Sequence, residues 1–289
     1  MKFPYHPNNI KWALRKAQLP IKATDLVLDV GSGSNPHPVA DVLLEKYVDV
    51  THRYDPLVAD RATVLADACK MPFRDKAFDF VIAFHVLEHM REPGQFLSEL
   101  QRVGRAGYIE TPNALFERLI PYNVHLLEIM DVDDCLTIHK KSAAKPDAFL
   151  NKLDLIQSSP KWNCFFYTNP DLFHVRYLWN DHICFKIVNP ETSCDWFQDP
   201  SVEVAQPAGG APVRRRRIRD VRSLGLSLLR GWHKLRKRRT FQLEDLLVCP
   251  ECRNTLKVGA EWLACGACRV RYPRLPYPDF NRPAQLPPA

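Results

Sequence analysis

The chain has 289 residues, 46% of them hydrophobic, which is enough for one large or two modest domains with a proper core. The formal net charge is +7, and residues 213–239 carry more than all of it: twelve Lys or Arg and one Asp give that segment +11 and leave −4 for the rest. No apolar run approaches the roughly eighteen residues that span a bilayer, and residues 1–7 lack the apolar segment of a secretory signal. We therefore expect a cytoplasmic protein.

Nine cysteines are present, and four of them form two CxxC pairs. This usage suits a metal site in a reducing compartment better than a disulfide framework.

The first 113 residues alternate between strand-like and helix-like patterns. Residues 9–18 fit a short helix that ends near Pro20. The patterns that follow predict strands and one helix: strands at 26–30, 41–44, 63–66, 78–84 and 107–110, and a helix at 93–103. Strands separated by crossovers predict a parallel sheet with helices on both faces. Ligands bind such sheets at the carboxyl ends of the strands.

A glycine turn follows the first predicted strand. Leu26–Val30 is short and mostly apolar, which is typical of a strand buried in a parallel sheet. Gly31 and Gly33 let the backbone turn tightly and approach a ligand closely. Alone, this pattern is a weak indication of nucleotide binding, because many strand ends use glycines only to turn.

From Leu26 to Asn113 the sequence resembles the class I methyltransferases that use S-adenosylmethionine. The resemblance continues past the glycine turn through Asp75–Phe80, before the fourth strand, and Glu110–Asn113, which is similar to the ubiquinone-pathway type. It implies an α/β fold, with a Rossmann-like, doubly wound and mostly parallel sheet.

In that family the first strand end and the glycine turn hold the methionine part of the cofactor. The second strand ends in an acid that binds the ribose hydroxyls, and the third ends in an acid beside the adenine. The resemblance therefore implies this cofactor-binding set: Asp29, Gly31, Ser32, Gly33, Glu45, Asp67, Ala68 and His85. A carboxylate suits the ribose because it can accept two hydroxyl hydrogen bonds at once.

One departure from the family pattern follows the glycine turn. Residues 35–38, Asn-Pro-His-Pro, replace the usual third glycine and leave little room for a long first helix. A short helix brings the ribose acid early, at Glu45. If the second strand lies elsewhere, Asp49 or Asp55 takes that role.

His85, Glu88 and His89 form an HxxEH pattern, which is found in inverted zinc metalloproteases. The context opposes a protease, because His85 directly follows a buried strand instead of lying on a helix. The Leu87–His89 string resembles one that is common in small-molecule and lipid methyltransferases. His85 could face the substrate as a base, and is the one catalytic candidate; a packing role in the loop is the alternative.

Residues 114–162 break the alternating pattern. Strands are expected at 125–130 and 135–139 around the acidic turn 131–134, followed by a polar helix. This insertion could cover the active site or be a surface hairpin without function. Residues 173–179 and 182–188 predict a hairpin that supplies the last two strands of the main sheet. The methyltransferase domain then spans residues 1–200.

Residues 201–240 form a Pro/Gly linker and a basic amphipathic helix in this interpretation. Apolar residues from Ile218 to Leu235 follow helical spacing among the arginines. Such a helix can bind nucleic acid or an anionic membrane surface, or it can pack on a domain with its charges solvated.

Residues 241–289 are expected to form a zinc ribbon. Cys249, Cys252, Cys265 and Cys268 form two CxxC turns, and each turn aims two sulfurs at one point. Four thiolates complete a tetrahedral structural zinc site with no open position. The flanking Leu247–Pro250 and Arg271–Pro273 resemble zinc ribbons of the tRNA-methyltransferase-activator type, although residues 274–278 depart from the usual turn.

These patterns predict an S-adenosylmethionine-dependent methyltransferase whose acceptor is a small molecule, lipid or saccharide intermediate. The (N/D)PP(Y/F) signature of base methylation is absent after the fourth strand. An RNA or protein acceptor, bound through the basic helix and the ribbon, is the alternative. A non-catalytic scaffold that retains the fold is the other.

Overall fold

The computed structural model describes residues 18–48, 56–143, 159–197 and 240–286. The predicted helix at 9–18, the basic segment and most of the polar helix expected after residue 139 lie outside these ranges, as do Asp49 and Asp55. Within them, no helix combines the length and the apolar character that crossing a bilayer requires.

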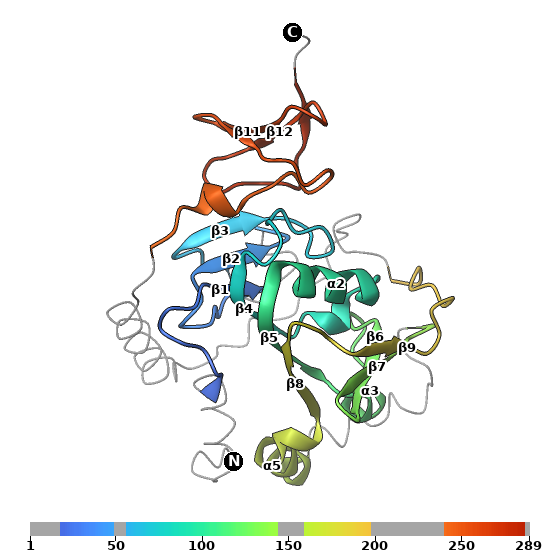
Figure 1. The fold of residues 1–289 in the computed structure, drawn as a ribbon. Helices are drawn as coiled ribbons and strands as arrows, with labels where there is room; N and C mark the ends of the chain where they lie inside the picture. The colour runs from blue at the N-terminus through green and yellow to red at the C-terminus, as the bar shows by residue number, and fades with distance from the viewer. Residues whose placement is uncertain (1–17, 49–55, 144–158, 198–239, 287–289) are drawn as a thin grey trace, which may run out of the picture.

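A six-stranded sheet forms the centre of the chain (Figure 1). Its strands, in spatial order, are β3 (Ala62–Leu65), β2 (Val42–Glu45), β1 (Val27–Val30), β4 (Phe78–Phe84), β5 (Gly104–Pro112) and β8 (His174–Asn180). All neighbours are parallel except β5 and β8. The mostly parallel α/β sheet is therefore confirmed. The order reverses between β1 and β4, where such sheets bind their ligands.

The two faces of this sheet are covered differently. Helix α2 (Pro93–Val103) has its predicted bounds and buries Phe96, Leu97 and Leu100 in the main core. The opposite face, which includes Phe80, packs against Leu19 and Ile21. Among the described residues, no helix joins β1 to β2 or β2 to β3, so helices on both faces are not found there.

A second sheet contains β6 (Leu127–Val132), β7 (Cys135–Lys140) and β9 (Phe185–Ile187). The two strands predicted in the insertion are confirmed as the β6–β7 hairpin. Asp133 and Asp134 turn with φ of 52° and 57°, and two-residue hairpin turns favour Asp at such positions. Helix α3 (Ala114–Leu119) precedes this hairpin, and α5 (Pro160–Thr168) and the short turn η5 (Pro170–Leu172) follow it.

The predicted hairpin of residues 173–188 is wrong in its second half. β8 joins the main sheet as expected, but β9 pairs in parallel with β7. There Phe185 and Ile187 pack against the main core, and the burial of their apolar surface stabilises this pairing. Cys135 and Cys184 form a disulfide across the β7–β9 pair. The cysteine pattern favours a metal site over a disulfide framework and does not predict this disulfide.

The last described segment is a small antiparallel module. It follows the short turn η6 (Leu243–Leu246) and contains β10 (Lys257–Val258), β11 (Trp262–Cys265), β12 (Val270–Pro273) and β13 (Ala284–Gln285), paired in that order. Figure 1 shows it in orange and red beside β3.

The module docks on the open edge of the main sheet. The Leu65 amide donates to Pro278 O (2.8 Å), and the Phe280 amide donates to Leu65 O (2.7 Å). Asp279 thus adds to β3 in parallel. A second backbone contact joins the Val248 amide to Pro72 O at 2.9 Å. The altered turn after β12 therefore leads into a segment that covers an otherwise unpaired edge.

Candidate functional site

The glycine turn lies at the carboxyl end of β1. Gly31 has φ of +67°, and a Cβ built on it would lie 2.6 Å from Val86 Cγ2, so no side chain fits there. Its amide donates to Leu44 O at 2.8 Å, which joins the turn to β2. Gly33, with φ of +57°, would meet nothing within 4 Å, so its α-carbon faces open space.

Glu45 ends β2 beside this turn and is 5% exposed. Its Oε1 accepts from the Ser32 hydroxyl at 2.7 Å and from the Gly33 amide at 2.5 Å. The carboxylate therefore fixes the glycine turn. The structure brings Glu45 together with Ser32 and Gly33, as a short β1–β2 connection requires.

A cavity of about 170 Å³ opens at this edge of the sheet, where the strand order reverses. Its lining residues are Asp29, Gly31, Ser32, Asn35, Phe84 and His85. Asp29 is buried and accepts from the His37 amide at 2.7 Å, so it holds the altered Asn-Pro-His-Pro turn in place. Asn35 and Phe84 were not predicted to line the site. Phe84 ends β4 and Asn35 lies in the turn after β1, and these positions at the carboxyl ends of strands could have indicated them.

Asp67 and Ala68 follow β3, at the same end of the sheet. The Asp67 carboxylate accepts from the Cys69 amide at 2.8 Å and pairs with Lys46 at 2.9 Å. Burial raises the pKa of Asp67, but these two partners outweigh it and hold the pKa below its usual value. Asp67 is therefore an anion at neutral pH. It is not among the residues that line the cavity beside His85.

His85 lies directly after β4 in a left-handed conformation, with φ of 55°. For a residue other than glycine such a conformation is strained, and strained positions concentrate at functional sites. Nδ1 lies 3.3 Å from Glu88 Oε1 and Nε2 lies 3.6 Å from Glu110 Oε1, both on buried carboxylates. Burial lowers the pKa of His85, but the two carboxylates outweigh burial and raise it to about 9. The ring is then protonated at neutral pH.

Glu88 and His89 lie in η3 (Leu87–His89), a single 3₁₀ turn. This turn is too short to be the helix that a metalloprotease HxxEH pattern needs. Asn113, the last residue of the Glu110–Asn113 string, accepts from the Phe116 amide at 2.9 Å and caps α3. Part of the string that resembles the ubiquinone-pathway type is therefore a helix start in this chain.

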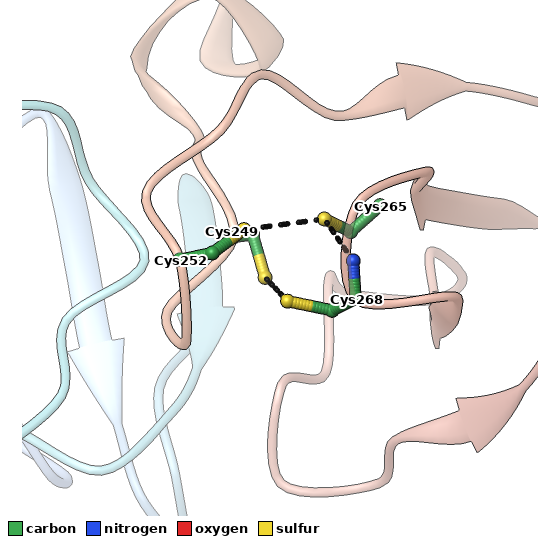
Figure 2. Close-up of side chains that lie close together, drawn as sticks. All are labelled: Cys249, Cys252, Cys265 and Cys268. Atoms are coloured by element: carbon green, nitrogen blue, oxygen red, sulfur yellow. Dashed lines mark hydrogen bonds between the residues drawn. The ribbon is translucent and has the colours of Figure 1, made fainter.

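The four cysteines of the C-terminal module converge from two turns, as Figure 2 shows. We call Cys249, Cys252, Cys265 and Cys268 the cysteine cluster; their sulfurs all lie within 4.8 Å of one another. The residue after each pair, Arg253 or Arg269, has a positive φ that closes the turn. Four sulfurs at this spacing could hold a tetrahedral Zn²⁺.

A larger cavity of about 510 Å³ lies at the opposite end of the sheet. Asp25, Asp79 and Arg105, near the amino ends of β1, β4 and β5, are among the residues that line it. None of the predicted site residues does. We therefore do not assign the functional site to this cavity, although it is larger, because ligands of such sheets bind at the carboxyl ends of the strands.

Part of the chain matches a known domain family. Residues 28–109 match the family described as "Methyltransferase domain". Among curated proteins, the chain is 40% identical over 43 residues to ajmaline N-methyltransferase of Rauvolfia serpentina, which is 15% of each chain.

Three solved structures are similar at low identity. A methyltransferase of Bacillus halodurans C-125 is 22% identical, over 35% of this chain and 51% of that one (TM-score 0.30). A complex of the Haloferax volcanii Trm112 methyltransferase activator with a methyltransferase is 20% identical, over 37% of this chain and 52% of that one (TM-score 0.29). Phosphoethanolamine N-methyltransferase 2 of Haemonchus contortus, solved with S-adenosyl-L-methionine, is 18% identical, over 37% of this chain and 28% of that one (TM-score 0.29).

The chain spans about half the length of the first two of these structures and 15% of the curated relative. The matched segment begins in β1, ends in β5 and contains the glycine turn, Glu45 and His85. Residues 28–109 therefore match a methyltransferase domain.

Proposed function

We propose that the whole chain transfers the methyl group of S-adenosylmethionine to an oxygen, nitrogen or carbon of a small-molecule, lipid or saccharide acceptor. One observation carries the proposal: the glycine turn, Asp29 and His85 line one cavity at the switch point, and Glu45 holds that turn.

The residues at this edge fit such a cofactor. Gly31 has no room for a side chain, and the open space beside Gly33 lets a ligand approach the backbone. The cavity of about 170 Å³ is smaller than the roughly 300–1,000 Å³ of ordinary ligand pockets, so it takes only part of the cofactor. We propose Asp29, Gly31, Ser32 and Gly33 for the methionine part, Glu45 for the ribose, and Asp67 and Ala68 for the adenine.

When bound, S-adenosylmethionine supplies a methyl group on an electrophilic sulfonium. The chain itself has to align the acceptor and exclude water. His85, at the rim of the cavity, is the residue we place against the acceptor. With a pKa of about 9 it donates hydrogen bonds at neutral pH, so it acts as a base only after it has lost a proton.

The cysteine cluster is proposed as a structural Zn²⁺ site. Four protein sulfurs fill a tetrahedral shell, and the module around them is too small to fold well on apolar burial alone.

The cysteines give opposing indications of the cellular compartment. Zinc-binding thiolates favour the reducing cytoplasm, whereas the Cys135–Cys184 disulfide favours an oxidising compartment. Counting thiols in denatured, zinc-free protein from the cytoplasm decides between the two, since seven free thiols indicate the disulfide and nine its absence.

The basic segment 213–239 remains a candidate for binding nucleic acid or an anionic membrane. An RNA or protein acceptor is favoured over a small molecule if the affinity for the acceptor falls steeply with salt, because phosphate contacts release counterions.

Calorimetric titration of the zinc-loaded full chain with S-adenosylhomocysteine tests the cofactor site. Glu45→Gln keeps the shape of the side chain but removes its charge, and Asp67→Ala removes the proposed adenine acid. Both variants are expected to bind at least 10-fold more weakly, which is about 1.4 kcal/mol.

Asp195→Asn is the control, because that carboxylate is 89% exposed and distant in sequence from the strand ends. It is expected to bind as the wild type does. No binding by a folded wild-type chain would overturn the enzyme proposal and favour a scaffold.

A further inference from the structure

A second group of metal-ligand side chains lies beside the proposed active site. Glu88, His89 and His125, which we call the histidine cluster, have ligand atoms within 4.8 Å of one another. Glu88 and His89 come from η3, and His125 comes from the loop before β6. Backbone contacts fix the two segments, since the Leu126 amide donates to Glu88 O at 2.7 Å.

The hydrogen bonds of the two histidines determine which nitrogen each presents. His89 Nδ1 lies 2.9 Å from Val124 O, and His125 Nδ1 contacts Glu117 Oε1. Carbonyl and carboxylate oxygens only accept, so both Nδ1 atoms donate. In the neutral ring each Nε2 then carries a lone pair. Metal-binding histidines are held in this way, with one ring nitrogen on a carboxylate or a backbone carbonyl.

Glu88 supplies the third acceptor. Its side chain is 1% exposed, and Oε2 accepts from the Thr111 hydroxyl at 3.0 Å. Oε1 has an ion-pair contact with His85 Nδ1 at 3.3 Å but no hydrogen bond among the described residues. A buried carboxylate oxygen without a hydrogen bond is costly, so a metal ion is a suitable further partner for it.

We propose that the histidine cluster binds a divalent transition metal ion of the Zn²⁺ class. Two imidazoles and a carboxylate bring one ligand atom each to the same place, and a cation removes the repulsion between their lone pairs. This donor set suits zinc and similar ions, and three protein ligands leave a position for water or an acceptor atom. His89 is only partly buried, which gives the ion a route from solvent.

The site differs from a metalloprotease HxxEH site. His85 is not a member of the cluster, and His125, which lies on the insertion, takes its place beside Glu88 and His89. The ion would therefore connect the insertion to the loop after β4, next to the cavity that His85 lines.

The metal content of the full chain tests the proposal. Wild type, His89→Gln and His125→Gln are loaded with excess Zn²⁺, dialysed together, and measured by atomic emission. Each variant is expected to hold one zinc equivalent fewer than the wild type, whatever the cysteine cluster binds. The side-chain amide of the His89→Gln variant keeps a donor for Val124 O, so this variant removes the ligand with the least disturbance.

His182→Gln is the matched control, because His182 is an exposed histidine of the same chain. It is expected to hold as much zinc as the wild type. Hydrogen exchange of the main sheet in the same dialysed samples shows whether each variant keeps the fold. Equal zinc content in wild type and a folded His89→Gln variant would overturn the proposal, and cofactor titration of the same samples tests the methyltransferase site separately.

Discussion

The cysteine cluster and the histidine cluster place ligand atoms equally close together, within 4.8 Å, but they are assembled in different ways. Each half of the cysteine cluster is a local CxxC turn, and its two halves are separated by twelve residues on one small module. The histidine cluster instead needs η3 and the insertion to pack before its ligands meet. A metal should therefore contribute to folding in the first cluster and bind an already folded site in the second.

Loss of the cysteine cluster should change the protein most. Cys265→Ser should remove the proposed zinc and unfold the module, because apparent zinc-binding energies in such modules are on the order of 10 kcal/mol. Hydrogen exchange of residues 246–285 measures this. Cys69→Ser, at a free cysteine outside the cluster, is the control. Full protection in the Cys265→Ser variant would show that the module folds without the metal.

The next effect concerns the attachment of the module to the main sheet. Glu99 is buried and accepts from Arg253 of the module at 3.0 Å, from Arg102 and from the Met71 amide. Glu99→Gln should destabilise the protein by about 2 kcal/mol, because hydrogen bonds to a charged group are weakened. Urea unfolding measures this, with exposed Glu191→Gln as the control.

Glu99 also predicts a pH dependence. Burial raises the pKa of Glu99, but the hydrogen bonds from Arg102 outweigh burial and lower it. Because the pKa of Glu99 is lower in the folded state than in the unfolded state, its carboxylate stabilises the protein fully when the pH is above the unfolded-state pKa of about 4.3. This stabilisation is lost as the pH falls through the pKa of the folded state. The Glu99→Gln variant should therefore lose less stability than the wild type below about pH 4. Equal losses would contradict this role.

A smaller effect is expected when the carboxylate that orients His125 in the histidine cluster is removed. Glu117 is buried and pairs with Lys141 at 2.9 Å while it orients His125. The Glu117→Gln/Lys141→Met double variant removes both charges together, so neither is left buried and unpaired. Zinc affinity at the histidine cluster should fall about 10- to 100-fold, as for other residues that orient a metal ligand. Competition with a chelator measures it, and the cysteine cluster should be unaffected.

The smallest expected effect is at an exposed ion pair between the module and the main domain. Lys70 and Glu251 lie 3.2 Å apart, and both side chains are more than half exposed. Lys70→Ala should change the stability by less than about 1 kcal/mol, because solvent and salt screen such pairs. A larger loss in urea unfolding would show that surface charges, and not the backbone contacts with β3, hold the module.

Much of the main sheet is predictable because its signals are local. β4 and α2 have their predicted bounds, and β1 to β3 lie within one residue of theirs. The same reasoning places Glu45 beside the glycine turn, because the Asn-Pro-His-Pro stretch leaves no room for a long helix. β5 is longer than predicted, since it pairs with β4 on one side and β8 on the other.

The partners of β9 and of the C-terminal module are not predictable in this way. An apolar run such as 182–188 shows that a strand exists, but its partner depends on which edge offers buried apolar surface. The same holds for the Cys135–Cys184 pair, whose members are 49 residues apart.

The parallel sheet, the glycine turn and the two cysteine turns are predictable from the sequence, because hydrophobic period, glycine and CxxC spacing act within a few residues. The docking of the module on β3, the pairing of β9 with β7 and the position of His125 beside Glu88 and His89 arise only when the chain folds. Those contacts join segments distant in the chain, and packing and hydrogen bonding across the folded core select them.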